Sequence, residues 1–418
     1  MLFAGPVSGA ASLLIAPFPQ VSHMGPHASD TLTRGAHGIY LVTPGPDGGP
    51  HLAVQEAAGA GTIAQAATRY SGTLIAVVLV LLMEFAAVAQ GTNAFGVLIS
   101  GLTLGSLYAV VALGYTMVYG IIELINFAHG DVFAFGAFAS LWLMEKMDSQ
   151  MADVNYQYSL GQHSLDVLGI QFHVPGMVLA IWTVMLAMVI AAVLCAILGV
   201  AVERIAYRPL RNAPRLAPLI TAIGMSFIIE NLLLQWRGGS SLSYPQIVPL
   251  THPTLFGAAF SDVDILAMVV ALVMMVLLDR FVNATKLGKA MRAVAQDREA
   301  ALMMGINVDR IIAVTFIVGS ALAGAGAVIY GMDLGSIGYN MGFTLGLYAF
   351  TAAVLGGIGN IRGAMLGGLL IGMVQQFVNT LDNGQGTAWS DPVVFAVLVL
   401  VLVFRPSGLL GAQIPEKV

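Results

Sequence analysis

Charged residues are scarce in this chain, and their scarcity argues against most classes of soluble protein. Only 9% of its 418 residues are Asp, Glu, Lys or Arg, whereas soluble domains contain about 25%. Hydrophobic residues make up 58% of the chain, and the mean hydropathy is +0.85. The formal net charge of −5 provides no positive field for a nucleic acid. These values indicate a polytopic membrane protein.

The chain has a single cysteine, no metal-binding pattern and no nucleotide-binding motif. Cys195 is the only cysteine, so no intrachain disulfide can form. No group of His, Cys, Asp or Glu has the spacing of a metal site, and we expect no cofactor. The P-loop pattern G-x-x-x-x-G-K-[ST] does not occur, because Gly288-Lys289 is followed by Ala290. An ATP-driven process would therefore need a separate motor subunit.

Residues 1–70 differ in composition from the rest of the chain. They contain seven of the 17 prolines, ten glycines and four histidines, without sustained periodicity. Such a segment buries too little apolar surface to offset its chain entropy. We predict a disordered extension over residues 1–70, although a mis-assigned start codon would give the same appearance.

Apolar runs long enough to cross a bilayer, which takes about 20 helical residues, recur from residue 71 onward. They predict an all-α membrane protein with about 8–10 transmembrane helices, some short or broken. The candidate spans are 72–89, 96–119, 126–145, 176–202, 216–235, 262–281, 311–332, 345–358, 364–380 and 392–404.

The first span, within residues 71–90, has two interpretations. Arg69, an apolar stretch and then Ala87-Val88-Ala89 resemble a signal peptide with its small-residue cleavage site. Alternatively, the segment is an additional membrane span. In both cases residue 96 begins on the outer side.

Lysine and arginine are distributed unevenly between the loops. With alternating spans and Arg69 inside, 15 of the 17 basic residues fall on the inner side, and only Lys146 and Arg237 fall outside. Since positive loops face the cytoplasm, the loop 285–310 and the C-terminus are predicted to be cytoplasmic.

A short motif occurs twice in the chain. The sequence LTLGSLYA at 102–109 returns as FTLGLYA at 343–349. This echo indicates an internal repeat of the kind that many transporters have. In a chain rich in Ala, Gly and Leu, coincidence is the alternative.

A few polar residues within or beside the spans are candidates for a substrate pathway. Asn126, His129 and Asp131 stand at the inner junction of two spans. A helix that begins there, capped by Asn126, would present free N–H groups to a carboxylate; alternatively, these residues form a polar turn that satisfies its own backbone. Glu230 and Asn231 lie near the outer end of another span, where the cost of a buried charge predicts that Glu230 faces protein or water.

The longest charged loop, residues 285–310, predicts two short amphipathic helices. Apolar residues recur at helical spacing, and Asp297 is placed to cap a second helix that Gly305 ends. The polar face carries Lys289, Arg292, Gln296 and Glu299. Such helices suit a groove on a partner protein; a solvated connector against the lipid headgroups is the alternative.

Four long motifs occur in order along the chain. They are GLTLGSLYAVVALGYTMVYGIIELINFAHGD (101–131), ERIAYRPLRNAPRLAPLITAIGMS (203–226), LGKAMRAVAQDREAALMMGINVDRIIAVTF (287–316) and FTAAVLGGIGNIRGAMLGGLLIG (350–372). Together they resemble the permease subunit of high-affinity branched-chain amino acid ABC transporters. The resemblance covers residues 92–418, identified as an importer permease domain, and residues 1–70 have no counterpart in it.

The resemblance implies a heteromeric importer in the bacterial inner membrane. One such permease pairs with a second, related permease, two ATPase subunits dock on the cytoplasmic side, and a periplasmic binding protein delivers Leu, Ile or Val. Glu299-Ala300-Ala301 followed by Gly305 is similar to the EAA---G loop that importer permeases place against the ATPase. The I-x-L-P tail of that loop is replaced by Ile311-Ile312-Ala313-Val314.

The resemblance thus implies a set of ATPase-coupling residues. They are Lys289, Arg292, Gln296, Asp297, Glu299, Ala300, Ala301 and Gly305. Other functions stay open at this point: an ABC permease for urea, short amides or sugars, and an ion-coupled secondary transporter, for which Glu84 and Glu230 are few and peripheral. An integral membrane enzyme is disfavoured, because no catalytic groups cluster at one interface.

Overall fold

The computed structural model of the chain consists of two units, Met1–Leu74 and Ile75–Val418, and each is described by itself. The structure describes residues 12–14, 31–35, 38–44, 50–53, 73, 76–88, 91–151, 162–167, 170–211, 213–214, 216–245, 247, 254–255, 257–405 and 407–411.

The first unit contains a four-stranded sheet in the order β1-β2-β3-β4. β1 (Ser12–Leu14) pairs in parallel with β2 (Thr31–Gly35), and β3 (Gly38–Pro44) and β4 (Pro50–Ala53) follow as antiparallel neighbours. Strand-forming residues such as Ile39 and Val42 favour this pairing, which the argument from composition overlooked. These strands lie within residues 1–70, for which disorder in solution stays a prediction.

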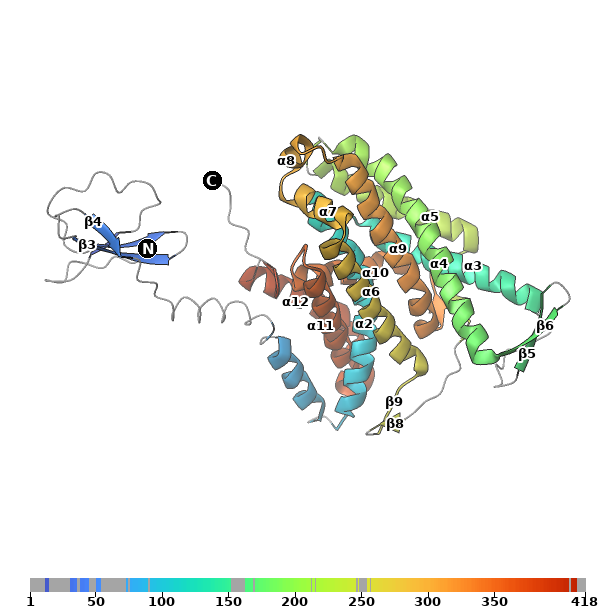
Figure 1. Cartoon of the computed structure of the whole chain (residues 1–418). Coiled ribbons are helices and arrows are strands. Elements are labelled where there is room, and N and C mark those ends of the chain that lie inside the picture. The colour runs from blue at the N-terminus through green and yellow to red at the C-terminus, as the bar shows by residue number, and fades with distance from the viewer. Residues whose placement is uncertain are drawn as a thin grey trace. The chain divides into compact units, whose positions relative to one another are not determined.

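The second unit is a helical bundle (Figure 1). A helix coincides with each of the ten predicted spans, and the all-α class is confirmed. These helices are Ala76–Val88, α2 (Ala94–Ile122), α3 (Ala128–Met151), α4 (Gly176–Val202), α5 (Leu216–Arg237), α6 (Asp262–Ala284), α9 (Val308–Leu334), α10 (Met341–Gly356), α11 (Ile361–Thr380) and α12 (Ser390–Phe404).

Seven helical segments in the described part of the chain are long and apolar enough to cross a membrane. Ala76–Val88 and α10 are apolar but shorter, and α3 carries charged residues such as Asp131 and Glu145. Short and polar helices of this kind agree with the predicted broken spans. The signal-peptide interpretation of residues 71–90 stays a prediction.

Shorter elements lie mostly at the two ends of the bundle. α7 (Lys286–Gln296) and α8 (Arg298–Met303) are at the end where α9 begins, and the hairpin of β8 (Thr254–Leu255) and β9 (Ala258–Ala259) is at the opposite end (Figure 1). The remaining short elements are β5 (Gln162–Val167), β6 (Ile170–Pro175), β7 (Leu242–Ser243), β10 (Ser336–Ile337), the π turn Glu203–Tyr207 and the 3-10 helices Arg208–Leu210 and Leu381–Trp389. β5 pairs with β6 and β7 with β10, both antiparallel.

Among the seven apolar segments, α2, α9 and α11 are the most enclosed and lie centrally, and most residues of α3 and α10 are buried as well. In α2, α9 and α11, 67%, 61% and 56% of the apolar window is buried, against 28% in α5, 22% in α6 and 11% in the segment that includes α12. Lipid tails are as apolar as the exposed side chains of the outer helices. The outer helices are therefore suited to face the bilayer while α2, α9 and α11 are enclosed.

Glycines bring the central helices into backbone contact. A Cβ placed on Gly372 of α11 would lie 2.1 Å from the backbone nitrogen of Gly105 in α2, and one on Gly368 would lie 2.5 Å from the Cα of Ala109. A Cβ on Gly324 of α9 would lie 2.4 Å from the carbonyl oxygen of Ala191 in α4. These glycines thus form surfaces of close helix contact.

The two copies of the repeated motif meet inside the bundle. Tyr108 and Tyr348, which occupy the same place in each copy, stack with their ring centroids 5.1 Å apart. Gln375 of α11 joins them, because it accepts from the Tyr108 hydroxyl at 2.6 Å and donates to the Tyr348 oxygen at 3.3 Å.

Candidate functional site

The connection between α2 and α3 begins at an exposed residue, Glu123, and leads into buried polar residues. α2 ends at Ile122, Glu123 turns the chain with a φ of 58°, and α3 begins at Ala128. The predicted residues Asn126, His129 and Asp131 are 3%, 1% and 0% exposed. They are therefore enclosed by protein, and the backbone N–H of His129 donates to the carbonyl of Asn126 at 3.1 Å, as in a turn that satisfies its own backbone.

Asp131 lies where the first turns of α3 and α10 meet. A Cβ placed on Gly342, in the first turn of α10, would lie 2.5 Å from Oδ1 of Asp131 and 2.8 Å from the carbonyl oxygen of Gly130. The first turn of a helix has N–H groups without intrahelical partners and a positive partial charge. These N–H groups favour a negative charge on Asp131, whereas its complete burial opposes one.

The two carboxylate oxygens of Asp131 have different surroundings. The hydroxyl of Ser226, from α5, donates to Oδ2, whereas Oδ1 accepts no hydrogen bond from any residue that the structure describes. Burying such an oxygen without a partner is costly, so a ligand cation or donor would be stabilised there. Glu230 is half-buried and lies one turn beyond Ser226 in α5.

His129 lies close to this cluster, and Asn231 does not. The imidazole of His129 packs edge-on against Tyr115 at 4.9 Å between ring centroids, and Gly114 leaves room for it. Asn231 is exposed, and its side chain donates to the carbonyl of Phe227 in its own helix at 2.7 Å. The structure thus pairs Asp131 with Ser226, encloses His129 beside Tyr115 and leaves Asn231 exposed.

α7 and α8 are separately capped helices, as the sequence predicts. Oγ1 of Thr285 accepts from the backbone N–H of Gly288 at 2.9 Å, and Oδ1 of Asp297 accepts from those of Glu299 and Ala300 at 2.9 and 3.0 Å. Gly305 ends this segment with a φ of 78°, which glycine adopts without strain. The predicted cap and stop are both confirmed.

Residues 285–305, here called the coupling segment, present a charged face and an apolar tip. Lys289, Arg292, Gln296, Asp297 and Glu299 are exposed, whereas Ala300 is half-buried and Ala301 is buried. Leu302, Met303 and Met304 are 58%, 83% and 82% exposed. Consecutive exposed apolar residues at the end of a short helix suit insertion into a partner's groove.

Two arginines fasten the coupling segment to the bundle. Arg292 donates to the carbonyl of Val282 and, at 3.2 Å, to Oδ1 of Asn283, both in α6. Arg298 donates at 2.7 Å to the carbonyl of Ile122, the last residue of α2. The segment is therefore connected directly to a central helix.

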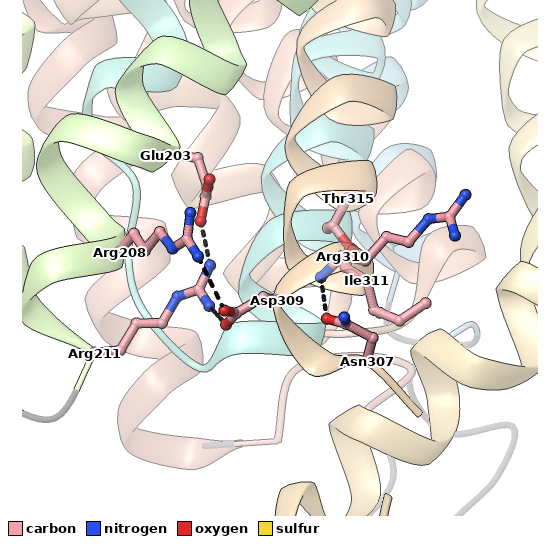
Figure 2. A network of polar contacts seen from close by, with 8 residues as sticks. All are labelled: Glu203, Arg208, Arg211, Asn307, Asp309, Arg310, Ile311 and Thr315. Atoms are coloured by element: carbon pink, nitrogen blue, oxygen red, sulfur yellow. Dashed lines mark hydrogen bonds and ion pairs between the residues drawn. The ribbon is translucent and has the colours of Figure 1, made fainter. Parts of the chain in front are cut away.

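A polar network, absent from the sequence-based prediction, occupies the turn after α4 (Figure 2). Arg211 donates to both Glu203 and Asp309, and Arg208 contacts Asp309 at 3.3 Å. The hydroxyl of Tyr207 is 3.1 Å from the carbonyl oxygen of Ile125 and from Oδ1 of Asn126. Asn126, predicted as a helix cap, therefore accepts a bond from the turn after α4.

Comparison with known proteins assigns this fold to a family. A family model described as "Branched-chain amino acid transport system / permease component" matches residues 97–402. The permease protein BraD of Pseudomonas aeruginosa is 42% identical over 328 residues, which cover 77% of this chain and 97% of BraD. LivH of Escherichia coli K12 is 38% identical over 324 residues, 76% of this chain and 96% of LivH.

A second permease protein of Escherichia coli K12, LivM, is 25% identical over 345 residues, 75% of this chain and 70% of LivM. No solved structure matches the chain. The chain is a transport subunit, since it matches permease components over most of its length. It belongs to the family of permease components of branched-chain amino acid transport systems.

Proposed function

We propose that this chain is the membrane-spanning subunit of an ATP-driven importer that carries branched-chain amino acids. The observation that carries the proposal is the 42% identity to BraD, named a high-affinity branched-chain amino acid transport system permease protein, over 97% of its length. The chain has no P-loop, so two separate ATPase subunits would supply the energy. A periplasmic binding protein would deliver the substrate, and the similarity to LivM supports pairing with a second, related permease.

The proposed location is the bacterial inner membrane, with the coupling segment and the C-terminus in the cytoplasm. The distribution of basic residues supports this orientation. Arg208, Arg211, Lys289 and Arg292 belong to the turn after α4 and to α7, which lie at the inner end of the predicted topology.

Force from the ATPase subunits would enter through the coupling segment. The apolar tip would seat in a groove of an ATPase subunit, and the charged face would line its rim. Arg292 and Arg298 would pass the movement to α6 and α2 through the bonds described above. Because α2 packs by backbone contact on α11, the central helices would move together.

The substrate would pass along the junction of α3, α5 and α10. A branched-chain amino acid has one ammonium group, one carboxylate and an apolar side chain. When the helices separate, the free oxygen of Asp131 would bind the ammonium group, and a helix start would bind the carboxylate. Ligand binding shifts the equilibrium only if the open and closed states differ in affinity.

Transport by the complete reconstituted complex tests the proposal. Leucine uptake into vesicles should require both ATP and the binding protein, should be inhibited by isoleucine and valine, and should persist with a protonophore at constant ATP. Loss of uptake with the protonophore would indicate a secondary transporter. Uptake of urea or a short amide in place of leucine would indicate the alternative ABC substrate.

The docking surface has its own test. Replacing the tip by Met303→Ser and Met304→Ser should weaken binding of the ATPase subunits about tenfold or more, because buried apolar anchors dominate such interfaces. Leu334→Ser, which removes an exposed apolar residue at the other end of α9, is the matched control. Unchanged ATPase binding by the tip variant would contradict the assignment.

A further inference from the structure

The start of α9, just after the coupling segment, is joined to the turn after α4 by Arg208 and Arg211. Asp309 is the second residue of α9 and follows Gly305 by four positions. Arg211, 11% exposed, donates to Asp309 on one side and to Glu203 on the other. Figure 2 shows Arg208 and Arg211 reaching Asp309, while Arg310 points away from them. Since the arginine fork binds both carboxylates, movement of Asp309 would act on Glu203.

The inner half of this connection is hard to break. The side chain of Glu203 is 2% exposed, and separating a buried carboxylate from its cation leaves an uncompensated charge. Asp309, with 57% of its side chain exposed, is the outer partner of the same guanidinium group. A displacement of α9 would therefore carry Arg211 and Glu203 along with it.

Glu203 and Tyr207 are the two ends of one π turn. Single π turns within helices are rare and occur often at functional sites. Tyr207 is 1% exposed and packs against Phe316 of α9 at 5.2 Å between ring centroids. Its hydroxyl reaches the side chain of Asn126, which precedes α3 by two residues and Asp131 by five.

We propose that Glu203, Tyr207, Arg211 and Asp309, here called the polar corner, transmit movement of the coupling segment to the start of α3. These four are positioning residues: they act on Asp131 through Asn126 and do not touch the substrate. The inference rests on the proposed function, because it gives a route for the coupling that an ATP-driven importer requires.

The test measures leucine taken up per ATP hydrolysed by the complete complex in vesicles. Tyr207→Phe removes only the hydroxyl that reaches Asn126, and Asp309→Asn removes only the negative charge at the start of α9. Each should lower this ratio about tenfold, a typical coupling factor, while ATP hydrolysis stays responsive to the binding protein. Tyr339→Phe and Arg310→Gln are the matched controls and should keep the wild-type ratio.

A purely structural role would give a different result. Uptake and ATP hydrolysis would then fall together with the amount of assembled complex, and an unchanged ratio in both variants would overturn the proposal. The double variant Tyr207→Phe/Asp309→Asn should lower the ratio of leucine to ATP no further than the more severe of the two single variants, because both changes interrupt one route. Additive losses would overturn the proposal.

Leucine uptake by the wild-type complex tests the proposed function independently of the variants. A wild-type complex that hydrolyses ATP without moving leucine would contradict the proposed function and this route with it. If Asp309→Asn fails to assemble, Tyr207→Phe decides alone, since it keeps the ring and its packing against Phe316.

Discussion

The α2–α11 interface and the polar corner join helices by opposite means. At the interface, glycines such as Gly105 and Gly372 put two backbones in direct contact, and the attraction comes from close packing. At the corner, Arg211 spans the distance between Glu203 and Asp309, and the attraction comes from charge.

This difference separates a fixed contact from a movable one. Backbone atoms in contact have one favourable arrangement, because a small shift produces either a clash or a gap. Long charged side chains keep their contact through a small displacement by changing rotamers. The central helices are therefore built to move as one body, whereas the corner can follow a shift of α9.

The largest expected effect comes from breaking the interface. Gly372→Leu would force a side chain into the backbone of Gly105, and overpacking of this kind strains or unfolds a structure. We expect no monodisperse protein in size-exclusion chromatography in detergent. Gly224→Leu is the control, because no atom lies within 4 Å of a Cβ at that position. Wild-type yield of Gly372→Leu would contradict the close contact.

Breaking the polar corner should lower stability less than Gly372→Leu does, and a second substitution should restore part of that stability. Arg211→Leu leaves Glu203 buried without its cation, which costs about 3–5 kcal/mol of unfolding free energy. Adding Glu203→Leu removes the unpaired charge and should restore part of the lost thermal stability. No such partner change exists for Gly372→Leu. A double variant less stable than Arg211→Leu would show that the pair is not the source of the loss.

A smaller effect, on transport and not on folding, is expected at Asp131. Asp131→Asn keeps the shape and an acceptor for Ser226, but it removes the charge that would bind the substrate's ammonium group. Leucine uptake should fall at least about tenfold, since a hydrogen bond to a charged group contributes about 1.5–3 kcal/mol. Asp333→Asn, at the outer end of α9, should transport normally. Normal uptake by Asp131→Asn would remove Asp131 from the substrate pathway.

The smallest effect is expected where a polar bond supplements the interface. Tyr108→Phe removes the hydroxyl that donates to Gln375 at 2.6 Å, which should cost about 1 kcal/mol. Thermal unfolding in detergent measures this loss. A loss as large as that of Arg211→Leu would mean that polar bonds, and not glycine packing, hold α2 against α11.

Features that depend on neighbouring residues in the chain were predictable. Ten apolar runs became ten helices because a run of that length can satisfy its backbone in lipid only as a helix. The cap at Asp297 and the stop at Gly305 follow from local side-chain and backbone chemistry. The strands between residues 12 and 53 are an exception, because the local sequence pattern did not predict them.

Contacts between distant segments had no such signal. Ser226 is 95 positions from Asp131, Tyr207 is 81 from Asn126, and Arg211 is 98 from Asp309. A serine or tyrosine in an apolar run looks the same whether it faces lipid or a buried carboxylate. Asn231 shows the opposite case. It was predicted as a pathway residue because it lies within a span, but its side chain is exposed.

The amino-acid order alone determined that this chain is a membrane protein, where its helices run and which loop carries two capped helices. Each of these depends on hydropathy and on hydrogen bonds within a few residues. Only the tertiary structure decided that α3 and α10 begin side by side at Asp131 and that two arginines join α9 to the turn after α4. Those contacts depend on which helix faces meet, and that is set by packing of the whole bundle.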